Sequence, residues 1–162
     1  MKTIVTGKIN SGKTRTLRAL HANASEGDGF AAVKWMEGSV VKGFDAMRLS
    51  TEETYPLIRR KGDEGGDTVA HTLGPYSFLR PAMERVEKEM DALIDSGVSP
   101  LFFDEAGLLE MEGKGFDGLI RRILAASADA FLVVRRDLLE AFLKRYDVDE
   151  YRVIKAGEAT WT

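Results

Sequence analysis

Short apolar runs alternate with amphipathic stretches along this chain of 162 residues. Apolar runs bounded by turn residues predict buried strands over 2–6, 30–36, 101–103, 130–134 and 151–155. Apolar residues at helical spacing predict helices over 13–24, 80–96, 116–126 and 137–145, the last opened by an acidic capping box of Asp137 and Glu140. This alternation predicts a largely parallel sheet with helices on both faces.

The segment 39–60 departs from this alternation. Its β-branched and aromatic residues are interrupted by Gly43, and Pro56 lies within the later run, so we expect a hairpin or two edge strands over 40–49 and 54–59. The glycine-rich and charged segment 61–67 predicts a loop. Because the chain has no repeat and no linker, we expect one domain over 1–162.

Composition narrows the classes of function. The chain has 23 basic and 26 acidic residues, and so lacks the basic surplus of proteins that neutralise nucleic-acid phosphates. Without cysteine it cannot form disulfides, thiolate zinc sites or a cysteine nucleophile. No apolar window approaches the roughly 20 residues of a membrane span, and the first residues do not read as a signal peptide. We therefore expect a cytoplasmic protein without a membrane or nucleic-acid partner; whether it has a protein partner is left open by the sequence.

A phosphate-binding loop is the strongest motif. The pattern G-x-x-x-x-G-K-[ST] is fulfilled by Gly7, Lys8, Ile9, Asn10, Ser11, Gly12, Lys13 and Thr14, between a predicted strand and a predicted helix. In such a loop the backbone N–H groups and the positive end of the helix bind phosphate oxygens. Lys13 supplies a charge for the β- and γ-phosphates, and Thr14 a hydroxyl for Mg²⁺. The motif predicts a nucleoside triphosphate, such as ATP or GTP, bound with Mg²⁺.

Two adjacent carboxylates end the buried strand at 101–103. In enzymes with a phosphate-binding loop, the first such carboxylate, here Asp104, holds Mg²⁺. The next one, Glu105, is placed to act as general base on an attacking water. Asp104 to Gly107 also reads as D-x-x-G, but the guanine-reading motif N-K-x-D is absent, so we expect no strong preference for one base.

Basic residues give weaker signals. Arg135 and Arg136 follow the strand at 130–134, where an arginine could stabilise charge in a transition state. Arg59 and Arg60, beside the loop at 61–67, could form a lid, although a solvated charged run is the better interpretation. Trp35 or Tyr76 could stack a base, with packing the better interpretation for both.

Beyond these motifs, the chain resembles the THEP-type nucleoside-triphosphatases along nearly its whole length. The resemblance rests on the N-terminal phosphate loop, on KGFDAMRL at 42–49, on LGPYSF at 73–78, and on DEAGLLEM at 104–111 followed by Lys114-Gly115-Phe116. It departs from the family at Ile9-Asn10, where the family usually has Pro-Gly, and at Arg15, where it has Thr or Ser near the α-phosphate. Asn tolerates left-handed geometry, so the loop can still close.

The resemblance implies a RecA-like three-layer α/β/α fold of the P-loop NTPase class, with a largely parallel sheet and an antiparallel extension. It implies slow hydrolysis of many nucleoside triphosphates with Mg²⁺, with residues 7–14 on the nucleotide, Thr14 and Asp104 on the metal, and Glu105 as base. Two alternatives stay open: a kinase for a small acceptor with 59–67 as its lid, and a nucleotide-switched binding module.

Overall fold

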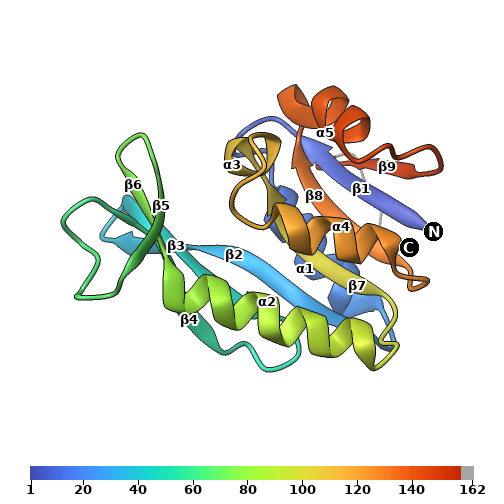
Figure 1. Cartoon of the computed structure of the whole chain (residues 1–162), viewed down its shortest axis with the longest axis horizontal. Coiled ribbons are helices and arrows are strands. Elements are labelled where there is room, and N and C mark those ends of the chain that lie inside the picture. The colour runs from blue at the N-terminus through green and yellow to red at the C-terminus, as the bar shows by residue number, and fades with distance from the viewer. Residues whose placement is uncertain (158–162) are drawn as a thin grey trace.

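The computed structural model describes residues 1–157; the last five residues of the predicted domain lie outside the described part. Within that part, one nine-stranded sheet forms the centre of the molecule (Figure 1). Five neighbouring strands are parallel, in the order β2 (Asp28–Glu37), β7 (Leu101–Ala106), β8 (Ala130–Arg135), β1 (Lys2–Gly7) and β9 (Arg152–Lys155). Beyond β2 the sheet continues antiparallel through β3 (Val40–Arg48), β4 (Thr54–Arg60), β6 (Tyr76–Leu79) and β5 (Val69–Leu73).

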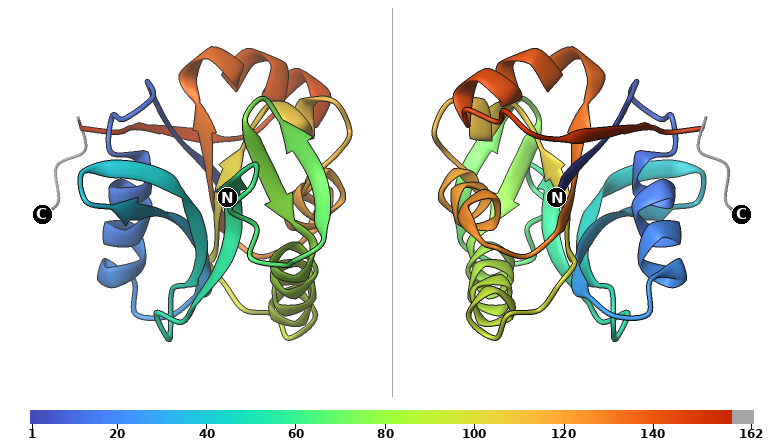
Figure 2. Two further views of the ribbon diagram at one scale, coloured as in Figure 1. Left: turned by 90° about the vertical axis from the view of Figure 1, so that its left-hand side faces the viewer. Right: turned by 90° about the vertical axis from the view of Figure 1, so that its right-hand side faces the viewer.

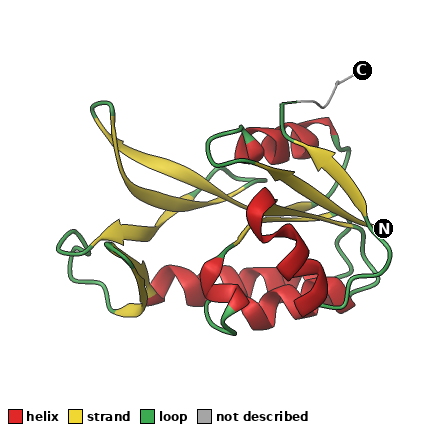
Figure 3. Ribbon diagram, turned by 90° about the horizontal axis from the view of Figure 1, so that it is seen from above, coloured by secondary structure: helices red, strands yellow, loops and turns green. Residues whose placement is uncertain are grey.

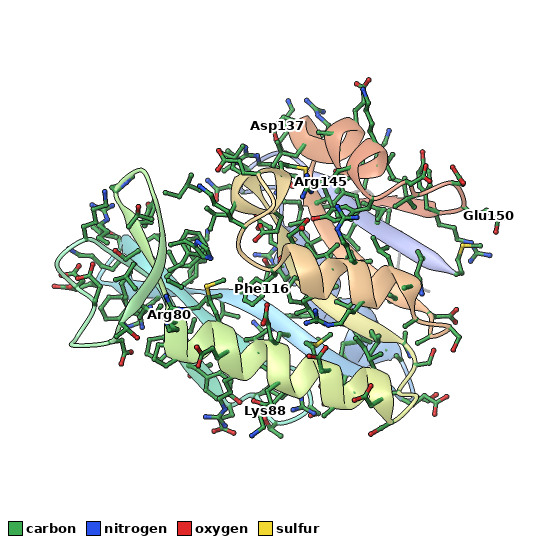
Figure 4. All side chains as sticks on the ribbon, in the orientation of Figure 1. Arg80, Lys88, Phe116, Asp137, Arg145 and Glu150 are labelled. Atoms are coloured by element: carbon green, nitrogen blue, oxygen red, sulfur yellow. The ribbon has the colours of Figure 1, made fainter. Side chains whose placement is uncertain are left out.

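Helices cover both faces of the sheet (Figure 3). One face carries α1 (Lys13–Asn23); the other carries α2 (Arg80–Asp95), α4 (Asp117–Ala125) and α5 (Leu139–Arg145). Alternation along the strands separates two apolar cores: on β8, Leu132 and Val134 face the larger core, and Val133 faces the α1 side. Side chains fill the larger core, where Phe116 stacks edge-to-face on Phe103 (Figure 4). The predicted α/β class, with its mostly parallel sheet and antiparallel extension, is confirmed.

The antiparallel extension is larger than predicted. The strands expected at 40–49 and 54–59 are β3 and β4, and Gly43 is required there, because a Cβ atom would come within 2.0 Å of the Ile58 carbonyl oxygen. Pro56 is tolerated since β6 pairs only with Ile58 to Arg60, leaving Pro56 beyond that ladder. The β5–β6 hairpin was not predicted. Its strands are short and carry mixed polar and apolar residues around a Gly74-Pro75 turn.

The start of the last helix was predicted wrongly. Residues Arg136–Leu138 form a short 3-10 turn, and α5 begins only at Leu139. The carboxylate of Asp137 accepts a hydrogen bond from Arg135 Nε at 2.5 Å instead of capping the helix. Among the described residues, no helix is both long and apolar enough to cross a membrane.

A short helix, α3 (Leu108–Met111), follows β7 and is held by Glu110. Oε1 of Glu110 accepts a hydrogen bond from the Gly107 N–H at 2.8 Å, and Oε2 accepts one from the Phe116 N–H at 2.9 Å. The Glu110 side chain is buried, which raises its pKa, while both backbone bonds act to lower it. Glu110 therefore clasps the loop after β7 through two backbone hydrogen bonds.

Replacing Glu110 with alanine leaves two N–H donors without their acceptor. We expect Glu110→Ala to lower the free energy of unfolding by about 1–3 kcal/mol. Glu112→Ala is the matched control. Glu112 is exposed, and its one ion pair, with exposed Lys114 at 4.0 Å, is long and weak. Its removal should therefore change the free energy of unfolding by less than about 0.5 kcal/mol. Urea denaturation at pH 7 measures both, and equal losses would contradict the clasp.

Candidate functional site

A cleft of about 1110 Å³ opens at the carboxyl ends of the parallel strands, where α/β sheets usually bind ligands. One wall is the segment from Ile9 to Arg15 together with α1, and the other is formed by β2 and β3. Figure 2 shows the β2–β3 hairpin on the same side of the molecule as α1. Of the predicted loop residues, Gly7 and Lys8 do not line the cleft, and the remaining ones do.

The phosphate loop has the backbone geometry that its sequence predicts. Asn10 has φ +61° and Gly12 has φ +88°, both left-handed, so the expectation that asparagine replaces the family's glycine without opening the loop is confirmed. Buried Lys13 folds back over the loop, and its Nζ donates a hydrogen bond to the Lys8 carbonyl oxygen at 2.7 Å. The loop therefore holds its lysine in place at the start of α1.

Asp104 connects three elements beneath the loop. Its Oδ2 accepts hydrogen bonds from Thr14 Oγ1 on α1 at 2.8 Å and from the Ala32 N–H on β2 at 3.0 Å. Its Oδ1 is buried and has no hydrogen-bond partner among the described residues. Burial, and next the charge of Glu105, raises the pKa of Asp104 to about 7, against the lowering effect of Ala32, Thr14 and Lys13. Among residues 1–157, this buried carboxylate forms no ion pair, although the charge of Lys13 acts on it from a longer distance.

Glu105 lines the cleft next to Asp104. The register between β7 and β8 shifts between Phe103 and Ala106, so one extra residue on β7 forms a bulge there. Neighbours on a regular strand point to opposite faces, and at this irregular end of β7 Asp104 bonds to Thr14 while Glu105 lines the cleft. Glu105 is exposed toward the cleft, yet the protein around its carboxylate removes enough solvent to raise its pKa, while the charges of Lys13 and Arg135 act to lower it.

The oxygen atoms at this point fit a small hard cation. Thr14 Oγ1, Asp104 Oδ2 and the unpartnered Asp104 Oδ1 are the kind of ligands that Mg²⁺ takes. No group of three or more His, Asp or Glu side chains suited to a metal occurs within residues 1–157. A cation bound here would thus need oxygens from a phosphate ligand or from water, as Mg²⁺ commonly does.

Of the weaker candidates from the sequence, some line the cleft and others do not. Arg135 lines the cleft because β8 pairs with β1 in register, with Arg135 opposite Gly7, whereas Arg136 does not line it. Tyr76 lines the cleft, and Trp35 instead lies under the guanidinium of Arg59 at 4.0 Å. No residue of 59–67 lines the cleft, and Arg59 forms a buried ion pair with Asp45 at 2.7 Å.

Sequence reasoning missed the residues farther along the cleft. Arg18, Lys34 and Phe44 line it beyond the phosphate loop. Arg18 carried a detectable signal, because it lies four residues after Thr14 and therefore on the same face of α1. Lys34 and Phe44 carried none, since only the pairing of β2 with β3 brings them together.

Two solved structures share this fold. THEP1 from the hyperthermophile Aquifex aeolicus aligns with a TM-score of 0.64 and 18% identity, over 98% of this chain and 91% of that one. A human cancer-related nucleoside triphosphatase aligns with a TM-score of 0.64 and 20% identity, over 97% of this chain and 89% of that one. Among curated proteins, none matches the sequence significantly.

The sequence profile of the NTPase family covers nearly the whole chain. It matches residues 2–158, a range that includes the phosphate loop, both carboxylates at the end of β7, and Arg135. This match agrees with the fold and with the resemblance found in the motifs, and it supports hydrolysis of nucleoside triphosphates in general. The chain belongs to the NTPase family.

Proposed function

We propose that this protein hydrolyses nucleoside triphosphates to the diphosphate and phosphate, depends on Mg²⁺, and accepts several bases at a slow rate. The observation that carries the proposal is the hydrogen bond from Thr14 Oγ1 to Asp104, with Glu105 beside it in the cleft. It brings the end of the phosphate loop against the acidic strand end, which is the pairing that magnesium-dependent phosphoryl transfer requires.

Each group has a role in the proposed reaction. The loop's backbone N–H groups and Lys13 hold the β- and γ-phosphates, and Glu105 accepts a proton from the water that attacks the γ-phosphorus. The bond from that phosphorus to the bridging oxygen breaks, and the diphosphate leaves. Mg²⁺ bound by Thr14 and Asp104 would neutralise charge on the phosphate oxygens. Arg135 lines the cleft at the end of β8 and would stabilise charge in the transition state.

Hydrolysis is favoured over the two alternatives. The kinase interpretation expected residues 59–67 as a lid, and none of them lines the cleft. A pure switch does not need a carboxylate such as Glu105 next to the metal-binding Asp104. The slow rate is what the resemblance to the THEP-type family implies, and the broad base tolerance follows from the absence of N-K-x-D.

Phosphate release from ATP, GTP, CTP and UTP tests the proposal directly. With Mg²⁺ we expect all four rates to agree within about an order of magnitude, since the phosphates supply most of the binding. Removal of Mg²⁺ with EDTA should abolish release.

Lys13→Ala should weaken triphosphate binding by about 1.5–3 kcal/mol, the value of a lost charged hydrogen bond. Unchanged ATP affinity in folded Lys13→Ala, measured by calorimetry, would refute the phosphate-loop assignment.

Substitution of Glu105 separates binding from chemistry. Glu105→Gln should keep the Kd for Mg-ATP and lower kcat by about 10²- to 10⁴-fold, the usual contribution of a general base. Glu112→Gln, at an exposed position after the same strand, is the control and should keep both values. If Glu105→Gln hydrolyses ATP at the parent rate, Glu105 does not activate water.

A further inference from the structure

Arg135 and Asp137 form an ion pair at the edge of the cleft. Arg135 is the last residue of β8, and the parallel register places it opposite Gly7, the first residue of the phosphate loop. Asp137 lies in the 3-10 turn that follows β8 (Figure 4). Nε of Arg135 donates a hydrogen bond to Asp137 Oδ1 at 2.5 Å. The two side chains are therefore joined at the sheet edge where the phosphate loop begins.

This hydrogen bond uses only one edge of the guanidinium. An arginine carries five N–H donors in a fixed plane, so a carboxylate bound at Nε leaves the donors of both Nη groups for another anion. Within residues 1–157, neither Nη group of Arg135 forms a hydrogen bond. Because Arg135 lines the cleft, these donors can meet an anion that binds there.

The charges around Arg135 show which groups it reaches. The hydrogen bond from Arg135 lowers the pKa of Asp137, and the charges of Arg135 and Lys13 act in the same direction. On the side of the cleft, loss of solvent raises the pKa of Glu105, and the charges of Lys13 and Arg135 act to lower it. Asp137 thus holds Arg135 directly, while Arg135 is close enough to act on Glu105, the proposed base.

The ion pair contributes little to the stability of the fold. The Asp137 side chain is 63% exposed and that of Arg135 is 24% exposed, and water weakens ion pairs at such positions. Asp137 also lies outside the helix that it was expected to cap, because α5 begins only at Leu139. The pair does restrict the Arg135 side chain, which would otherwise sample many rotamers.

We propose that Asp137 is a positioning residue for the hydrolysis of nucleoside triphosphates, and this inference rests on the proposed function. Asp137 holds Arg135 by its Nε edge, so that the Nη groups meet the phosphate oxygens over which charge spreads in the transition state. A cation that is already oriented stabilises this charge without having to be ordered during the reaction. Asp137 itself contacts neither the nucleotide nor the attacking water.

Steady-state hydrolysis of Mg-ATP tests this role. Asp137→Ala should lower kcat about tenfold and keep KM within about twofold, because it misplaces a group whose contact forms in the transition state. Asp137→Asn keeps an oxygen that can accept the hydrogen bond from Nε, and should recover most of the lost rate. Glu140→Ala is the matched control, since Glu140 is exposed and does not line the cleft, and it should keep both values. The urea midpoint of each variant should equal that of the parent.

A double variant shows whether Asp137 acts through Arg135. Arg135→Ala should lower kcat about 10²-fold, as for one lost donor to transition-state charge. Adding Asp137→Ala to it should lower kcat no further, because the two residues then act as one unit. Additive losses, or an Arg135→Ala protein that hydrolyses ATP at the parent rate, would overturn the positioning role. So would Asp137→Ala faster than the parent, or Asp137→Asn as slow as Asp137→Ala.

Binding of Mg-ADP with aluminium fluoride separates this inference from the proposed function. Aluminium fluoride mimics the phosphoryl group in transfer, so its binding reports on transition-state contacts without turnover. Asp137→Ala should weaken this binding about tenfold and leave that of Mg-ADP alone unchanged. If the parent hydrolyses no triphosphate but this loss occurs and requires Arg135, the positioning role stands and the proposed function fails. If the parent hydrolyses ATP and Asp137→Ala binds as the parent does, hydrolysis stands and the positioning role is overturned.

Discussion

The burial of one carboxylate organises the functional half of this molecule. Asp104 has almost no contact with solvent, and it receives its hydrogen bonds from α1, which covers one face of the sheet, and from β2, the strand beside β7. A buried carboxylate without a positive partner is costly, and here the cost is visible as a pKa of about 7. Its hydrogen bonds hold the start of α1 and the strand β2 together around this group. A cation bound here would offset the free-energy cost of burying the Asp104 carboxylate.

The local parts of the site were predictable because they are written in consecutive residues. Gly7 to Thr14 needs only a strand before it and a helix after it, and both are present. Asp104 and Glu105 were recognised for the same reason. The bulge of β7 against β8 at these two residues is not revealed by the apolar pattern at 101–103.

The parts that failed depend on contacts that the spacing of apolar and polar residues does not specify. Nothing in the sequence around Glu110 indicates that its side chain is buried and accepts hydrogen bonds from two backbone N–H groups. The sequence around Asp137 is typical of a helix cap, but its carboxylate accepts a hydrogen bond from Arg135 instead. The cleft beyond the phosphate loop is lined by residues of α1, β2 and β3, which share no spacing along the chain. The β5–β6 hairpin is short enough that periodicity has little to detect.

The position of β1 in the sheet has a consequence for the order of folding. β1 lies between β8 and β9, so both of its ladders are made with the last strands of the chain. The phosphate loop begins where β1 ends, and it is therefore anchored only when the C-terminal third has been added. During synthesis β1 cannot pair until β8 and β9 have been made. Contacts between residues so far apart in the sequence slow folding. A chain interrupted before β8 carries the entire phosphate-loop motif without the sheet that supports it.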